Sequence, residues 1–260
     1  MNTIFRRIAK FFVSLLLMLW SFTIGLFTPK GQYIHSLICR YFGFVFDKPK
    51  LPLIEQSAFL SDTTVQLTEL QVQPGNMSVD EMSTIAAIVK KFQPKRIFEI
   101  GTMNGRTTLN MALNAPDDCE IFTLDLPADA AENTKFNISK RYLRLVDKAQ
   151  SGELFANKSA IYFTCIQLIK QLYGDSVTFE FSRFENSIDV VFIDGSHDFD
   201  YVLNDSEIAL KLLRNGKGII LWHDYRPEID VVPALEVFRK RHPEIEISHI
   251  RDTTFAFASL

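Results

Sequence analysis

The residues best suited to chemistry begin at a glycine loop. Residues 96–100 (RIFEI) are mostly apolar and run into Gly101, and Gly105 then precedes a segment, 109–113, with helical spacing. This order predicts a strand, a tight turn and a helix N-terminus, where backbone N–H groups and the helix dipole favour an anionic ligand group. Gly101 would allow a strained turn and a close approach to a ligand, and Gly105 would let the helix pack tightly on the strand.

An acidic residue follows this loop at an informative distance. Residues 120–125 (EIFTLD) are typical of the next strand, and Asp125 ends it. An acid roughly 20 residues beyond a glycine loop is where a nucleotide ribose is held through its hydroxyl groups. The loop and Asp125 together predict a nucleoside-cofactor site.

The pattern E-x-G-x-x-x-G over residues 99–105 resembles motif I of the class I S-adenosylmethionine (SAM)-dependent methyltransferases. Met103 stands where their commoner pattern has a middle glycine, and the loop lacks glycines of the dinucleotide pattern G-x-G-x-x-G. The resemblance implies SAM as the cofactor. The expected cofactor-binding residues are Glu99, Gly101, Thr102, Gly105, Asp125 and Asp175.

Further polar residues stand where other strands should end. The buried-type runs 188–193 and 218–222 lead into Asp194 with His197 and into His223 with Asp224, respectively. A third strand is expected over residues 165–169, before Asp175. Ligands of open α/β sheets bind beyond the carboxyl ends of the strands, so these side chains should converge on one crevice.

A second resemblance is more specific. Residues 191–197 (VFIDGSH), 212–216 (LLRNG) and 218–225 (GIILWHDY) are similar to the corresponding stretches of one methyltransferase branch. That branch includes the macrocin-type O-methyltransferases and the cephalosporin-hydroxylase-like proteins. The similarity covers residues 78–260 and implies O-methylation of a small or lipid-linked hydroxylated acceptor.

The resemblance also implies roles for the strand-end residues. Asp175 would lie beside the adenine, while Asp194 and Asp224 match carboxylate ligands of a divalent metal such as Mg²⁺. His223 replaces an acid there, which would favour a softer metal. His197 stands about where related O-methyltransferases keep a general base, and His223 is the second candidate catalytic residue. Each of these residues could instead only cap a strand or close a turn.

Composition and periodicity set the fold class. The 260 residues are 47% hydrophobic with a formal net charge of -3, which gives no general drive toward nucleic acid. The three cysteines have no C-x-x-C spacing, so we expect a reducing compartment and no disulfide framework. Repeated β-α units, closed by strands within residues 244–259, predict a doubly wound, Rossmann-like α/β fold. We expect a mostly parallel, seven-stranded sheet with a C-terminal antiparallel hairpin.

Residues 1–47 are expected to be a membrane-associating helical segment. Residues 11–29 carry no charge and follow three basic residues, and residues 34–45 present one apolar helical face. The alternative is a hydrophobic cap packed on the soluble domain. Residues 48–77 indicate a linker, and the catalytic domain, 78–260, should begin at the capping box of Ser78. A re-entrant or surface-lying anchor would keep that domain in the cytoplasm, where SAM is made.

Two other functions are compatible with these patterns. One is a hydroxylase-like or NAD-linked oxidoreductase on the same fold, although the missing dinucleotide glycines argue against NAD. The other is a non-catalytic, membrane-tethered module that retains a nucleoside pocket. The sequence names neither the methyl acceptor nor the oligomeric state.

Overall fold

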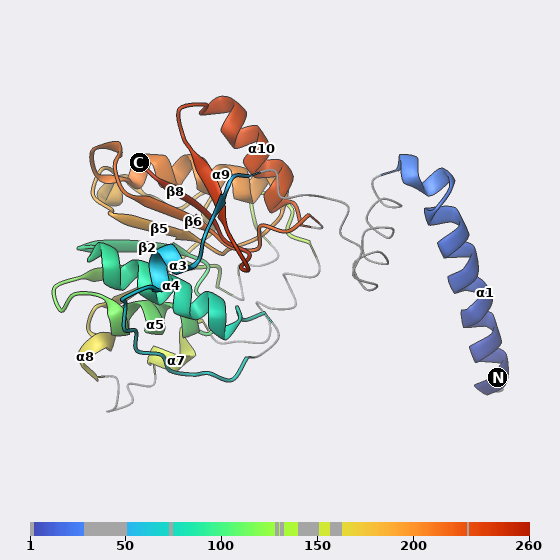
Figure 1. The fold of residues 1–260 in the computed structure, drawn as a ribbon, viewed down its shortest axis with the longest axis horizontal. Coiled ribbons are helices and arrows are strands. Elements are labelled where there is room, and N and C mark those ends of the chain that lie inside the picture. Colours follow the sequence, from blue (N-terminus) through green and yellow to red (C-terminus); the bar gives the residue numbers. More distant parts are fainter. Residues whose placement is uncertain are drawn as a thin grey trace. The chain divides into compact units, whose positions relative to one another are not determined.

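The computed structural model describes residues 3–28, 51–72, 75–127, 130, 133–139, 151–156, 163–227 and 229–260. The chain divides into two compact units, Met1–Lys50 and Leu51–Leu260. Each unit is described by itself (Figure 1).

The second unit is built on one eight-stranded sheet with the order β1-β7-β8-β6-β5-β2-β3-β4 (Figure 1). Strand β8 runs antiparallel to both of its neighbours, and every other pairing is parallel. The doubly wound fold with a C-terminal antiparallel hairpin is thus confirmed, with eight strands in place of the expected seven. The strands are β1 (Leu53–Ile54), β2 (Arg96–Ile100), β3 (Glu120–Asp125), β4 (Ile169–Tyr173), β5 (Val190–Ile193), β6 (Ile219–Trp222), β7 (Ile247–Ile250) and β8 (Ala256–Ser259).

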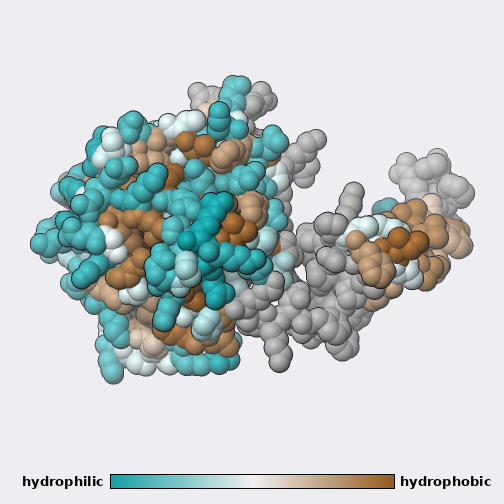
Figure 2. Space-filling model, turned by 90° about the horizontal axis from the view of Figure 1, so that it is seen from above, coloured by the Kyte–Doolittle hydropathy of each residue, from teal (hydrophilic) through white to brown (hydrophobic). Residues whose placement is uncertain are grey.

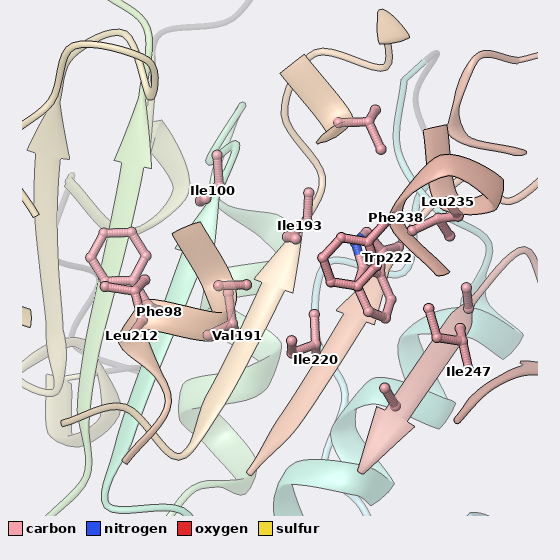
Figure 3. Close-up of a cluster of buried hydrophobic side chains, with 14 of the residues drawn as sticks. Phe98, Ile100, Val191, Ile193, Leu212, Ile220, Trp222, Leu235, Phe238 and Ile247 are labelled. Carbon is pink, nitrogen blue, oxygen red and sulfur yellow. The ribbon is translucent and has the colours of Figure 1, made fainter. Parts of the chain in front are cut away.

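Helices cover both faces of this sheet, which explains the unbroken apolar runs of its central strands. Helices α4 (Val79–Phe92) and α5 (Arg106–Asn114) lie on one face, and α9 (Phe199–Leu212) and α10 (Val231–Arg241) on the other. Side chains alternate along each strand between two core clusters. In β5, Val191 and Ile193 pack toward α9 and α10 (Figure 3), whereas Val190 and Phe192 pack toward α4 and α5.

The range 48–77, expected as a linker, contributes to this unit. Strand β1 pairs with β7 at the sheet edge, and Phe59 of the short helix α3 (Ser57–Leu60) is buried. Helix α4 begins at the predicted capping box of Ser78. The edge strand was not expected because two residues leave no periodicity to detect.

Three polar side chains of α5 bind the segment that precedes α4. Asn114 accepts from the backbone N–H of Gln66 at 2.9 Å and donates to its carbonyl at 2.7 Å. Asn110 pairs in the same way with Thr68, at 2.8 and 3.2 Å. Arg106 donates to two further carbonyls of that segment, at 2.5 and 2.8 Å. The three side chains share one helix face because they are spaced four residues apart.

One strand lies later in the sequence than expected. Residues 163–166 form the short helix α8 (Phe163–Ile166), and strand β4 follows it at Ile169–Tyr173. Strand β4 is at the edge of the sheet, and none of its side chains is fully buried. Its apolar pattern is therefore weaker than that of the central strands.

The first unit contains helix α1 (Thr3–Ser21) and a 3₁₀ turn, η1 (Ile24–Phe27). Large apolar side chains of α1 are exposed, among them Phe11 and Leu16, and Figure 2 shows hydrophobic residues over the helix surface. Among the described residues, no helix is both long and apolar enough to cross a bilayer. The second helix expected, over 34–45, lies outside the described residues.

Candidate active site

A cavity of about 340 Å³ opens at the carboxyl ends of β2, β3, β4 and β5. Its walls come from the loops after these strands, from helix α9 and from residues 75–77. Six of the predicted site residues line it: Gly101, Thr102, Asp125, Asp175, Asp194 and His197. Glu99, Gly105, His223 and Asp224 are not among its lining residues.

Glu99 lies fully buried beneath the glycine loop. Its Oε2 accepts hydrogen bonds from the hydroxyls of Thr108 and Thr123, the latter at 2.6 Å. Thr123 Oγ1 is also 2.6 Å from Thr102 Oγ1 in the cavity wall. Burial raises the pKa of the Glu99 carboxyl to about 8. Glu99 therefore organises the loop from below, one layer away from a ligand.

A side chain at either loop glycine would collide with neighbouring protein atoms. Gly101 has φ +100°, and a Cβ there would lie 2.2 Å from the carbonyl oxygen of Asp194 at the end of β5. Gly105 has φ +84°, and its Cβ would lie 2.4 Å from the Phe155 ring in α7 (Glu153–Ala156). The packing partner of Gly105 is thus α7. Met103, at the position of the absent glycine, has φ +50°, which costs a residue with a side chain roughly 1–2 kcal/mol.

Asp125 stands in the cavity wall at the end of β3. Burial raises the pKa of its carboxyl to about 6, although Ser151 and nearby backbone N–H groups, including that of Thr102, partly oppose the shift. The carboxyl thus lies beside the glycine loop in the cavity wall. An acid at the end of the strand that follows such a loop is where a nucleotide ribose is held through its hydroxyl groups.

Asp175 already has three protein donors. Its Oδ1 accepts from the backbone N–H of Val177 at 3.0 Å and from the hydroxyl of Tyr201 at 3.1 Å. Its Oδ2 accepts from the backbone N–H of Lys135 at 2.8 Å. The residue closes its own turn and ties it to α9 and to the segment 133–139.

Two histidines and two aspartates gather at the ends of β5 and β6. His197 Nε2 lies 3.4 Å from Asp194 Oδ1 and 3.5 Å from Asp224 Oδ2. His223 Nδ1 lies 2.9 Å from the same oxygen of Asp194. Behind it, His223 Nε2 lies 3.8 Å from Glu81 Oε2. Asp224 is further paired with a guanidinium at 2.7 Å.

The charges of this group balance one another. Burial disfavours an ionised Asp194, but the two neighbouring imidazoles outweigh it and lower its pKa to about 2. Burial likewise opposes a charged His223, yet Asp194 and Glu81 raise its pKa well above the ordinary value. His223 also holds the pKa of the buried Glu81 below its usual range. The inner part of the site is therefore a carboxylate–imidazolium–carboxylate row.

The donor atoms of Asp194, His197 and His223 lie within 4.8 Å of one another. If His223 gave up its proton, two imidazoles and one carboxylate would suit zinc or iron better than Mg²⁺, which takes oxygen ligands. Asp224, the second ligand expected for Mg²⁺, does not belong to this group and holds Arg226. The side chains near Asp194 therefore fit a softer ion better than the Mg²⁺ site implied by the sequence.

Sequence reasoning missed two buried acids of this region. Glu81 forms the expected capping box with Ser78, and its other oxygen accepts from the N–H and hydroxyl of Thr254 at 2.8 and 2.7 Å. Asp205 is fully buried and lines the cavity. A signal for Asp205 was present, because it lies four residues from both Tyr201 and Ala209 on the apolar face of α9. An acid on such a face is rarely buried without a function or a partner.

These buried acids predict how the stability of the ligand-free protein depends on pH. The folded-state pKa values of Glu99, Asp205 and Asp125 are raised to about 8, 7 and 6. In the unfolded chain these groups lose their protons near pH 4. The folded state thus holds more protons between about pH 4 and 8, and stability falls as pH rises through this window. We expect a lower free energy of unfolding at pH 8 than at pH 5.5 in denaturant titrations.

Glu99→Gln should flatten this dependence, because its side chain does not titrate. Glu185→Gln, at an exposed position, serves as the matched control and should keep the wild-type slope. A ligand-free protein whose stability increases from pH 5.5 to pH 8 would contradict the buried, protonated state of these carboxyls.

Comparisons with known proteins agree with this geometry. Residues 98–225 match a family described as "Methyltransferase domain". The O-methyltransferase TomG from Streptomyces achromogenes, involved in tomaymycin synthesis and solved with SAM, is similar over 78% of this chain and 95% of its own, with 16% identity and a TM-score of 0.50. A methyltransferase of Podospora anserina bound to S-adenosylhomocysteine (SAH) is 18% identical over 71% of this chain and 79% of its own, with a TM-score of 0.49.

An uncharacterized protein of Acanthamoeba polyphaga mimivirus is 33% identical over 81 residues, which is 30% of this chain and 37% of that protein. The chain thus spans little more than a third of this relative. The family match includes the glycine loop, Asp125 and both strand ends that carry the histidines. Residues 98–225 are therefore a methyltransferase domain, and the unit around them has the fold of the class I, SAM-dependent methyltransferases.

Proposed function

We propose that this chain is a SAM-dependent O-methyltransferase that acts on a hydroxylated small molecule. The observation that carries the proposal is one cavity that holds both the glycine loop with Asp125 and the pair His197–Asp194. Asp125 would hold the ribose, and the backbone of residues 101–104 would face the amino-acid part of SAM. When bound, SAM supplies an electrophilic methyl group.

His197 is the proposed general base. An acceptor hydroxyl must lose its proton as its oxygen takes the methyl group, and a positioned imidazole can remove it. Asp194 and Asp224 face His197 Nε2 and would stabilise the imidazolium that forms. His223, already charged and outside the cavity lining, would not accept this proton. We assign it a positioning role, because it fixes the oxygen of Asp194 that faces His197.

Replacing Asp125 tests the cofactor site. Asp125→Ala should weaken SAM binding by roughly 2–4 kcal/mol, the scale of losing charge-assisted hydrogen bonds to the ribose. Calorimetric titration of the folded variant with SAM measures this loss. Asp118→Ala, at an exposed position before β3, should bind as the wild type does. Unchanged affinity of the Asp125 variant would remove this residue from the site, and binding of NAD in place of SAM would favour the oxidoreductase alternative.

Replacing His197 tests the chemistry. His197→Ala should lower turnover by about 10²–10⁴, the usual contribution of a positioned base, while SAM affinity hardly changes. Acceptor-dependent release of SAH measures turnover, after a screen of extracted metabolites and lipids with labelled SAM has identified an acceptor. His242→Ala, near the protein surface, is the matched control. If no acceptor is methylated although SAM binds, the chain is instead a non-catalytic nucleoside-binding module.

A metal-assisted route is the second candidate, favoured by the cluster of Asp194, His197 and His223. A bound divalent ion would hold and acidify the acceptor hydroxyl. Under this route a chelator abolishes turnover and a divalent ion restores it. Under the base mechanism alone, the wild type keeps its activity in the presence of chelator, which separates the two routes.

We also propose that α1 attaches the enzyme to a membrane surface and brings the cavity to lipid-linked acceptors. The support is a helix with basic residues at its start and exposed apolar side chains along the rest. The full chain should co-sediment with vesicles that contain anionic lipid, whereas a chain lacking residues 1–47 should stay in solution and still bind SAM. Equal co-sedimentation of both chains would contradict attachment through α1.

A further inference from the structure

A short segment, residues 133–139, supplies Ile138 to the wall of the cavity. The segment contains neither helix nor strand, so its contacts with the rest of the unit must hold it in place. The Phe136 ring packs edge-on against Tyr201 of α9, with the ring centroids 5.5 Å apart. The hydrogen bond to Asp175 described above fastens the N-terminal part of the segment. One side of the cavity is therefore covered by irregular chain that α9 and the loop after β4 hold down.

Asp198 fastens the other end of this segment. It directly precedes α9, and its Oδ2 accepts from the backbone N–H of Ser139 at 2.8 Å. The same oxygen accepts from the hydroxyl of Ser196 at 2.9 Å. Ser196 and Asp198 flank His197 in the sequence. One carboxylate thus binds both the segment 133–139 and the loop that carries the proposed base.

Asp198 makes this contact in place of the one that its position favours. It is the N-cap residue of α9 and has the extended backbone of such a residue. An aspartate there ordinarily accepts a hydrogen bond from the backbone of the first helical turn. The structure describes the whole of α9, and the Asp198 side chain makes no such bond with it. The carboxylate therefore has two alternative partners, the Ser139 N–H and the first turn of its own helix.

We infer that residues 133–139 form a lid over the cofactor and that Asp198 is its latch. The inference rests on the proposed SAM-dependent function and deepens it, because it concerns how the cofactor enters and leaves. A pocket buries most of the surface of a ligand of this size, so exchange is faster when a wall segment can move aside. In the closed state Asp198 binds Ser139, and in the open state the same carboxylate caps α9. The regained cap offsets part of the lost contact, so the two states differ by less than one charge-assisted hydrogen bond.

The test is surface plasmon resonance of SAH on the immobilised full chain, which gives the association and dissociation rate constants separately. Asp198→Ser keeps a side chain that caps α9 but is too short to reach Ser139. It should raise both rate constants by about 3–30-fold and change Kd by much less, because a looser lid speeds entry and exit alike. Asp198→Asn should give smaller increases, since its amide oxygen still accepts from Ser139. Asp200→Ala, which removes an exposed acid from the first turn of the same helix, is the matched control and should keep the wild-type rates.

Unchanged rate constants in Asp198→Ser would overturn the inference. So would faster dissociation without faster association, since this is the result of a distorted cofactor site. Hydrogen exchange tests the latch without any ligand, because the Ser139 amide should lose protection in Asp198→Ser and keep it in Asp200→Ala. Equal protection in both variants would also overturn the inference. Failure of the wild type to bind SAH would instead overturn the proposed function, so the two failures are distinguishable.

Discussion

The absence of a side chain at Gly101 is the constraint on which the site depends. The backbone N–H of Gly101 donates to Leu124 at 2.8 Å, and Asp194 donates to Ile100 at the same distance. Three neighbouring strands therefore end within hydrogen-bonding reach of one another. Any Cβ at Gly101 would meet the carbonyl of Asp194 and force β2 and β5 apart. Only this close approach places the glycine loop and Asp194 in the same small cavity.

A second constraint is the neutralisation of charge behind the cavity. Asp194 could not stay ionised at this depth without a cation, and His223 could not stay protonated without its two carboxylates. Glu81 supplies the second carboxylate from the first turn of α4 while it caps that helix. Glu81, at the start of α4 on one face of the sheet, thus helps to keep His223 protonated at the end of β6. Because the three groups depend on one another, removing one would leave a buried charge without its partner.

Much of the fold could be predicted from the sequence, for reasons visible in particular residues. The runs around Val191 and Ile220 are apolar on both faces because helices cover both faces. The edge strands were harder. Strand β1 is too short to show a pattern, and β4 has polar and half-buried side chains where a central strand has apolar ones. The positions of the glycine loop and of the acids at the strand ends could be predicted, because their spacing along the sequence determines where they lie in the fold. The long-range partners of Asp175 and Glu81, such as Tyr201 and Thr254, could not be predicted, because they come from segments distant in sequence.

The pairing of α5 with the preceding segment has a consequence for the boundaries of the functional unit. Arg106 follows the glycine loop directly and binds the carbonyls of Glu69 and Met77, while residues 75–77 form part of the cavity wall. One wall of the cavity thus comes from chain that lies before the region matched by the methyltransferase family. A fragment cut at the limits of that match would keep the loop, the acids and the histidines but would leave the cavity open on this side. The smallest unit able to enclose a ligand is therefore longer than the family domain and includes the segment that α5 holds in place.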